Sequence, residues 1–163
     1  MRSFREEFDN STDEVRRKTY YEVGNFVAGE EARLALKNGK NIVCDRYFCS
    51  TNAYIMGRAA KSVEVLLKKN DPSWPSWPQH LQRPTHMFVL TLPHEVRKAR
   101  LAARVAASNG LEAETAEEAL LRESDSTCDA INAAFEKLGC VRVSAEGETS
   151  DVVDRLYSLI TKE

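Results

Sequence analysis

Hydrophobic positions along the chain change between helical and strand-like spacing. The first periodic stretch predicts a helix that begins at the capping box Ser11–Glu14 and runs to about Lys37. Its apolar positions recur every three or four residues, so we expect them to form a buried stripe. That stripe consists of Val15, Thr19, Val23, Phe26, Val27 and Leu34.

Downstream of this helix the pattern predicts three short strands separated by helices. In chain order these are a strand over 41–44, a helix over 51–69, a proline-marked loop over 70–84, a strand over 85–92, a helix over 93–107, a helix over 115–139, a strand over 140–143 and a helix over 150–161. Strands that alternate with helices are typical of a parallel sheet covered on both faces. Three strands are fewer than the usual number in a sheet. We therefore expect the later part of an α/β domain whose first strands are absent.

Composition indicates one globular domain. The chain has 163 residues, of which 42% are hydrophobic and 29% charged, and its formal net charge is -2. This balance does not favour a general nucleic-acid or membrane surface, and no apolar run approaches the ~20 residues of a membrane span. The N-terminus resembles neither a secretory signal nor a transit peptide. The four cysteines lack a Cys-x-x-Cys pair and are expected to be free, buried thiols in an intracellular compartment.

Candidate chemistry is concentrated where the first predicted strand ends. Asp45 and Arg46 follow the apolar run 41–44 directly, and a Ser/Thr-rich helix start comes next. The carboxyl end of a parallel strand is where α/β proteins bind ligands, and an arginine fork suits the oxygens of a phosphate. The alternative is a salt-bridged turn without function. His80, His86 and His94 lack metal-ligand spacing, so no metal site is predicted.

Three motifs resemble the thymidylate kinase family, and its mitochondrial UMP-CMP kinase 2 branch in particular. The first is Asp45-Arg46-Tyr47-x-x-Ser50-Thr51-x-Ala53-Tyr54, which is similar to the Asp-Arg-Tyr signature of the family. The second is Arg16-Arg17-x-x-Tyr20-Tyr21-x-x-Gly24-Asn25-Phe26, and the third is Trp77-Pro78-x-x-Leu81-x-x-Pro84. The resemblance implies an incomplete P-loop kinase fold, a three-layer αβα parallel sheet with its first strands absent, over a single partial domain at 1–163.

The resemblance also implies roles for individual residues around a pyrimidine nucleoside monophosphate. Arg46 would hold its phosphate, and Asp45 would orient Arg46 or a magnesium-bound water. Tyr21 would stack on the base, and Asn25 would bond its edge. The remaining pocket residues would be Ser50, Thr51 and Tyr54, which line the sugar and base.

Two arginines would belong to a lid over the donor phosphates. Arg100 and Arg104 lie four residues apart, so they share one face of the helix over 93–107. In the family such arginines close over the donor and exclude water. The alternative is that they form a solvated helix face together with Arg97.

No phosphate loop is found within the chain. The stretch from Gly24 to Glu31 has the glycine spacing, but Glu30 and Glu31 stand where Lys and Ser/Thr are required. The segment also lies inside a predicted helix, so its glycines are expected to allow close packing or ligand approach. The resemblance implies ATP and Mg²⁺ as cofactors, at a donor site that would precede residue 1. We therefore expect a truncated kinase chain that is inactive alone.

Several functions remain open. The first is ATP-dependent phosphorylation of dTMP, dUMP, UMP or CMP to the diphosphate. The alternative is a non-catalytic pseudokinase or nucleotide-binding interaction protein, and a weaker third option is a deoxynucleoside kinase. The family implies a homodimer through the first helix and a cytoplasmic or mitochondrial location.

Overall fold

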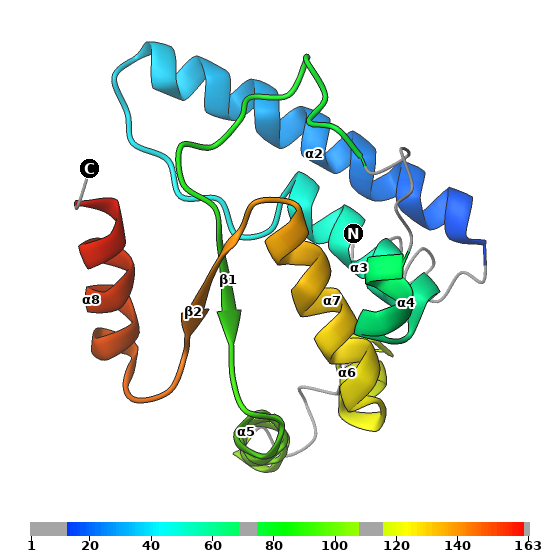
Figure 1. The fold of residues 1–163 in the computed structure, drawn as a ribbon. Coiled ribbons are helices and arrows are strands. Elements are labelled where there is room, and N and C mark those ends of the chain that lie inside the picture. The colour runs from blue at the N-terminus through cyan, green and yellow to red at the C-terminus, as the bar shows by residue number, and fades with distance from the viewer. Residues whose placement is uncertain (1–12, 69–74, 108–115, 162–163) are drawn as a thin grey trace.

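The computed structural model describes residues 13–68, 75–107 and 116–161. Helices dominate it, and two strands form its small sheet (Figure 1). The elements in chain order are α2 (Glu14–Lys37), α3 (Phe48–Ala60), α4 (Val63–Lys68), β1 (Phe88–Thr91), α5 (His94–Ala107), α6 (Ala116–Glu123), α7 (Asp125–Lys137), β2 (Val141–Ser144) and α8 (Thr149–Ile160). The chain is therefore a mixed α/β structure.

The two strands are parallel and lie side by side, with Phe88 opposite Val141 and Leu90 opposite Val143. The connection between them contains α5, α6 and α7, as a parallel pair requires a long crossover. This confirms the predicted parallel pairing of the strands over 85–92 and 140–143, although each strand is only four residues long.

The predicted strand over 41–44 was wrong. These residues have no regular secondary structure, and Val43 is 99% exposed. A strand is held by hydrogen bonds to a neighbouring strand, and no described segment pairs with this one. The apolar composition of 41–44 therefore identified a strand-like sequence, but the described part of the chain supplies no partner for it.

Helix boundaries differ from the prediction where local capping intervenes. Asp13 is the N-cap of α2, and its Oδ1 accepts hydrogen bonds from the backbone N–H groups of Val15 and Arg16, at 3.0 and 3.1 Å. The predicted cap, Ser11, lies outside the described residues. The helix predicted over 51–69 is instead two helices, because Lys61 adopts a left-handed conformation with φ of 59° and ends α3. Residue 69 is not described.

The helix predicted over 115–139 is also divided. Ser124 is extended and caps α7 by accepting a 3.2 Å hydrogen bond from the backbone N–H of Thr127. Thr115, the predicted start, lies outside the described residues. The helices predicted over 93–107 and 150–161 are confirmed as α5 and α8, each within a residue or two.

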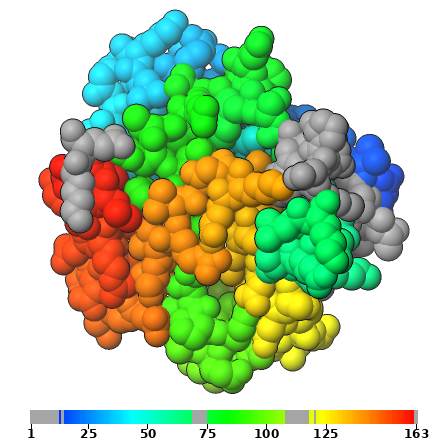
Figure 2. Space-filling model, in the orientation of Figure 1, coloured from blue at the N-terminus to red at the C-terminus, as the bar shows by residue number. Residues whose placement is uncertain are grey.

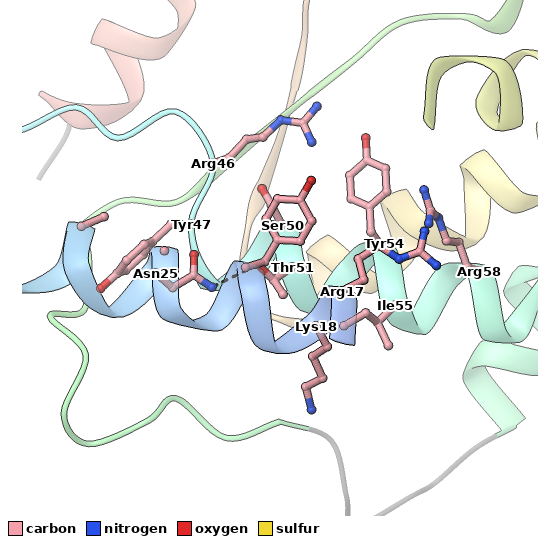
Figure 3. Close-up of a pocket in the computed structure, with 13 residues that line it drawn as sticks. Arg17, Lys18, Asn25, Arg46, Tyr47, Ser50, Thr51, Tyr54, Ile55 and Arg58 are labelled. Carbon is pink, nitrogen blue, oxygen red and sulfur yellow. Dashed lines mark hydrogen bonds between the residues drawn. The ribbon is translucent and has the colours of Figure 1, made fainter. Parts of the chain in front are cut away.

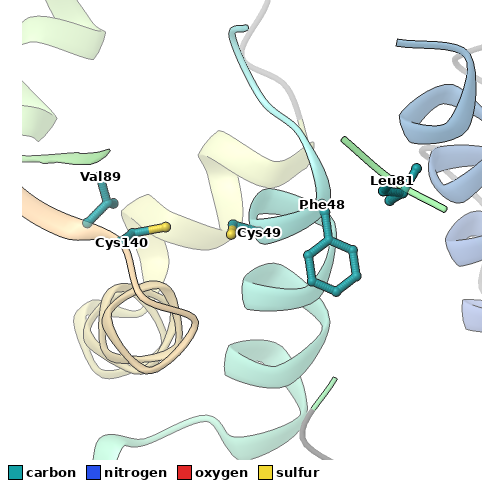
Figure 4. Close-up of a cluster of buried hydrophobic side chains, with 5 residues drawn as sticks. All are labelled: Phe48, Cys49, Leu81, Val89 and Cys140. Atoms are coloured by element: carbon teal, nitrogen blue, oxygen red, sulfur yellow. The ribbon is translucent and has the colours of Figure 1, made fainter. Parts of the chain in front are cut away.

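The core lies where α3 packs on α7 and on the start of both strands. One buried cluster consists of Phe48, Cys49, Leu81, Val89 and Cys140 (Figure 4), and a second of Ala53, Ala60, Leu66 and Ala134. Small residues let α3 and α7 approach closely, because a methyl group at Gly57 would lie 2.4 Å from Ile131 Cγ1. The face drawn in Figure 2 has α8 (red) at one edge and α4 (teal) at the other.

The predicted buried stripe of the first helix was wrong. Val15, Val23, Phe26, Val27 and Leu34 are all exposed in α2, and Val15 is 74% exposed. Figure 1 shows α2 as a long helix across one end of the molecule, beside α3. The described part of the chain covers only part of the surface of α2. Helical periodicity therefore identified an apolar face of this helix, but not a segment that buries it. Among the described residues, no helix has the length and apolar character needed to cross a bilayer.

Candidate functional site

A pocket of about 200 Å³ lies between α2, the segment that precedes α3, and α3 itself (Figure 3). Both helices present one face to it, since its lining residues recur at three- and four-residue intervals along each. The described residues that line it are Arg17, Lys18, Tyr21, Gly24, Asn25, Ala28, Arg46, Tyr47, Ser50, Thr51, Tyr54, Ile55 and Arg58.

Six of the residues predicted for the site are brought together in this pocket. From α2 come Tyr21 and Asn25, one helical turn apart. The Asp-Arg-Tyr motif and α3 supply the others, which are Arg46, Ser50, Thr51 and Tyr54. The first and last of these residues are 33 positions apart in the sequence, so the fold, not local sequence, joins them.

A hydrogen bond ties the two walls of the pocket together. Asn25 Nδ2 donates to Thr51 Oγ1 over 3.0 Å, and the pair is partly buried. This bond joins the middle of α2 to the first turn of α3 (Figure 3). Asn25 therefore has a structural role, and the base-edge role implied by the resemblance stays a prediction.

Arg46 reaches the pocket through an unusual backbone conformation. Its φ is 67°, in the left-handed region that a residue with a Cβ seldom adopts. Its guanidinium carbon lies 5.5 Å from the centre of the Tyr54 ring, within the range of a cation–π contact. Left-handed backbone at a residue other than glycine costs on the order of 1 kcal/mol or more, and such strain is concentrated at functional sites.

Three cationic residues of the pocket were not predicted. Arg17, Lys18 and Arg58 line it together with Arg46, and the lining residues include no carboxylate. The Arg58 guanidinium lies 5.8 Å from the Tyr54 ring centre. Helical spacing could have identified two of them, because Arg17 is four residues before Tyr21 and Arg58 is four residues after Tyr54.

Tyr47 lines the pocket and packs against Gly29 of α2. Its hydroxyl oxygen is buried and has no hydrogen-bond partner among the described residues. Burial raises the pKa of this phenol above its usual range, with smaller contributions from Cys44 and Glu30, so it stays a neutral donor. A Cβ on Gly29 would lie 2.5 Å from that oxygen, so only glycine fits at this position of α2 without displacing Tyr47.

The two glycines that mimic a phosphate loop have different surroundings. Both lie within α2, in agreement with the prediction that they are part of a helix. Gly29 allows close packing against Tyr47, whereas a Cβ on Gly24 would meet nothing within 4 Å. Gly24 lines the pocket, so it leaves room for a ligand.

Three predicted site residues are placed elsewhere. Asp45 is exposed and does not line the pocket. Arg100 donates to the carbonyl oxygens of Ala145 and Gly147, both at 3.0 Å, in the loop after β2. Arg104 of α5 forms an ion pair with Glu118 of α6. The lid role of the two arginines therefore stays a prediction, since they hold other parts of the described structure.

The histidines lie outside the pocket. His94 contacts Asp125 and Asp129 of α7, with Nδ1 3.3 Å and Nε2 3.1 Å from their carboxylate oxygens. His80 packs on Phe26, and His86 stacks on Phe88. No cluster of three His, Cys, Asp or Glu side chains suited to a metal ion occurs in the described ranges. With no carboxylate in its lining, the pocket offers no ligand set for Mg²⁺, so no step is assigned to that ion.

Comparison with known proteins adds no relative to this picture: no family model, no curated protein and no solved structure matches the chain.

Proposed function

We propose that this chain carries the acceptor site of a nucleoside monophosphate kinase, and that the pocket between α2 and α3 binds a pyrimidine nucleoside monophosphate. The observation that supports it most is the meeting of Tyr21, Asn25 and Arg46 with the Ser/Thr-rich start of α3 in one pocket. These groups supply an aromatic face, an amide, hydroxyls and a guanidinium, which match a base, a sugar and a phosphate.

The charge and size of the pocket agree with such a ligand. A phosphate monoester carries about −1.5 to −2 charges at pH 7, and the pocket is lined by four cationic side chains. Its volume of about 200 Å³ is below the ~300–1,000 Å³ of pockets that hold drug-sized ligands. A small ligand suits this space better than a larger one.

The strained conformation of Arg46 provides a test in which folding and binding respond differently. Replacing a left-handed residue by glycine removes the Cβ penalty, so Arg46→Gly is expected to be about as stable as the wild type. The same change removes the guanidinium from the pocket. We expect its affinity for UMP, CMP or dTMP to fall at least tenfold, because a charge-assisted hydrogen bond contributes about 1.5–3 kcal/mol.

Lys61→Gly is the matched control. Lys61 is the other described non-glycine residue with positive φ, at 59°, and it lies at the end of α3 outside the pocket. Isothermal titration calorimetry should show wild-type affinity for Lys61→Gly and weak binding for Arg46→Gly. Absence of nucleotide binding by the wild-type chain, or equal affinity of the two variants, would contradict the proposal.

A second candidate is a nucleotide-binding protein that does not catalyse phosphoryl transfer. It is favoured by the contacts of Arg100 and Arg104, which hold the loop after β2 and the region of α6 and do not face the pocket. An assay of ADP release with ATP and UMP tests whether this chain catalyses phosphoryl transfer by itself. The 163-residue chain is expected to bind the monophosphate without turnover, and ATP-dependent turnover by this chain alone would show that it contains its own donor site.

A further inference from the structure

Two buried thiols face one another in the core. Cys49 lies in the first turn of α3 and is 8% exposed, and Cys140 directly precedes β2 and is 6% exposed. Both belong to the cluster that also contains Phe48, Leu81 and Val89. In Figure 4 their sulfur atoms point toward one another from two different elements. Both cysteines are free.

The side-chain interaction between the two thiols makes them unequal, because it lowers the pKa of Cys140 and raises that of Cys49. Burial opposes the effect at Cys140 and adds to it at Cys49. A third sulfur adjoins the pair, because the thiol of Cys49 donates a 3.6 Å hydrogen bond to Met87 Sδ. Cys140 is therefore the thiol of the pair that becomes the nucleophile more readily.

We propose that Cys49 and Cys140 are a redox-active pair, which a peroxide converts into a disulfide joining the first turn of α3 to the start of β2. The thiolate of Cys140 attacks one oxygen of hydrogen peroxide, the O–O bond breaks, and the leaving hydroxide takes up a proton to form water. The thiol of Cys49 then attacks the Cys140 sulfenic acid, the S–O bond breaks, and a second water leaves with the Cys49 proton. Two thiols are oxidised and one peroxide is reduced to two waters.

This inference is independent of the proposed function, although its place in the fold connects the two. Cys49 immediately precedes Ser50 and Thr51, which line the pocket. A bond at Cys49 would fix the turn that carries both hydroxyls. It would also close a chain segment of about 90 residues, and long closed loops give the largest entropic stabilisation.

The other two cysteines provide internal comparisons. Cys44 is exposed, and its thiol bonds the Arg46 carbonyl oxygen at 3.2 Å. It would form disulfides between molecules, so the experiment uses a Cys44→Ser background. Cys128 is buried like the pair, but its contacts are Arg97 and Asn132, not another thiol. Cys128 therefore reports how a buried cysteine without a neighbouring thiol responds.

The test is differential thiol labelling of the folded protein after hydrogen peroxide. Remaining thiols are blocked with light N-ethylmaleimide in denaturant, and disulfides are then reduced and labelled with the heavy reagent. We expect heavy label on Cys49 and Cys140 together, light label on Cys128, and a cross-linked peptide pair 2 Da lighter before reduction. The midpoint of thermal unfolding should rise by roughly 5–15 °C and return with dithiothreitol.

The variants Cys49→Ala and Cys140→Ala should each lose the heavy label at the remaining partner. Light label on Cys49 and Cys140, as on Cys128, would overturn the proposal, and so would heavy label spread over all three cysteines. Because the decisive labelling is done without replacing either member of the pair, an unfolded Cys140→Ala variant does not affect the conclusion.

Discussion

The close approach of α3 and α7 at Gly57 leads to a quantitative prediction. A methyl group added by Gly57→Ala would lie 2.4, 2.6 and 2.7 Å from Cγ1, Cα and N of Ile131. Two of these atoms belong to the backbone of α7, so a change of side-chain rotamer cannot remove the clash. The helices would have to separate at the centre of the second core cluster.

The expected magnitude follows from two opposing effects. Overpacking of a close-packed core costs about 1–3 kcal/mol and sometimes more. Replacing glycine by alanine inside a helix stabilises the folded state by up to about 1 kcal/mol. Gly24→Ala isolates the second effect, because Gly24 is also inside a helix and its Cβ would meet nothing within 4 Å. We expect Gly57→Ala to be less stable than Gly24→Ala by about 1–3 kcal/mol.

Urea unfolding followed by circular dichroism at 222 nm measures this difference. With the slope of the transition unchanged, the urea midpoint of Gly57→Ala should fall below the wild-type midpoint. The midpoint of Gly24→Ala should equal or exceed the wild-type midpoint. Equal midpoints for the two alanine variants would show that α3 and α7 do not pack as closely as the structure indicates.

Two further predictions concern polar contacts. Asp13→Ala removes the cap of α2 and should lower the free energy of unfolding by about 0.5–2 kcal/mol in the same urea assay. Asp13→Asn should retain most of the stabilisation that the cap provides. Asp125 contacts Lys98 Nζ at 3.1 Å, and this hydrogen bond lowers the pKa of the carboxyl below its ordinary 3.8. Its stabilising effect is therefore complete above that value and is lost as the pH falls through the lower folded-state pKa. The difference in thermal midpoint between wild type and Asp125→Asn should be larger at pH 7 than at pH 2.5, and an equal difference at both would contradict the assignment.

From the local sequence, the helices and strands were predicted more reliably than the surfaces that each of them buries. The helix that follows Pro93, the last helix and both parallel strands agree with the prediction, because each depends on spacing and capping within a few residues. Interruptions at Lys61 and Ser124 were missed, since each depends on one residue's backbone conformation and neither is glycine or proline. Burial of α2 was also predicted wrongly, because it depends on what packs against the helix.

Only part of the pocket could be predicted, because spacing determines which residues share a helix face but not how distant helices pack. Residues within one helix face or one turn, such as Tyr21 with Asn25 and Ser50 with Thr51, lie together as their spacing requires. Arg100 was assigned to the ligand only through a resemblance, and in the structure its guanidinium reaches from α5 to the carbonyl oxygens of the loop after β2. Long-range placement of a helix cannot be obtained from periodicity alone.

The pocket and the attachment of α2 depend on the same contacts. The apolar stripe of α2 is exposed, and the contacts of this helix with the rest of the described structure include the Asn25–Thr51 hydrogen bond, the packing of Gly29 on Tyr47 and the contact of Phe26 with His80. The first two of these contacts involve residues that line or adjoin the pocket. A ligand that bridges the two helices therefore adds to this interface, and at a hundred times its dissociation constant it would stabilise the bound state by about 2.7 kcal/mol. Occupancy of the pocket and docking of α2 are thus expected to be thermodynamically linked.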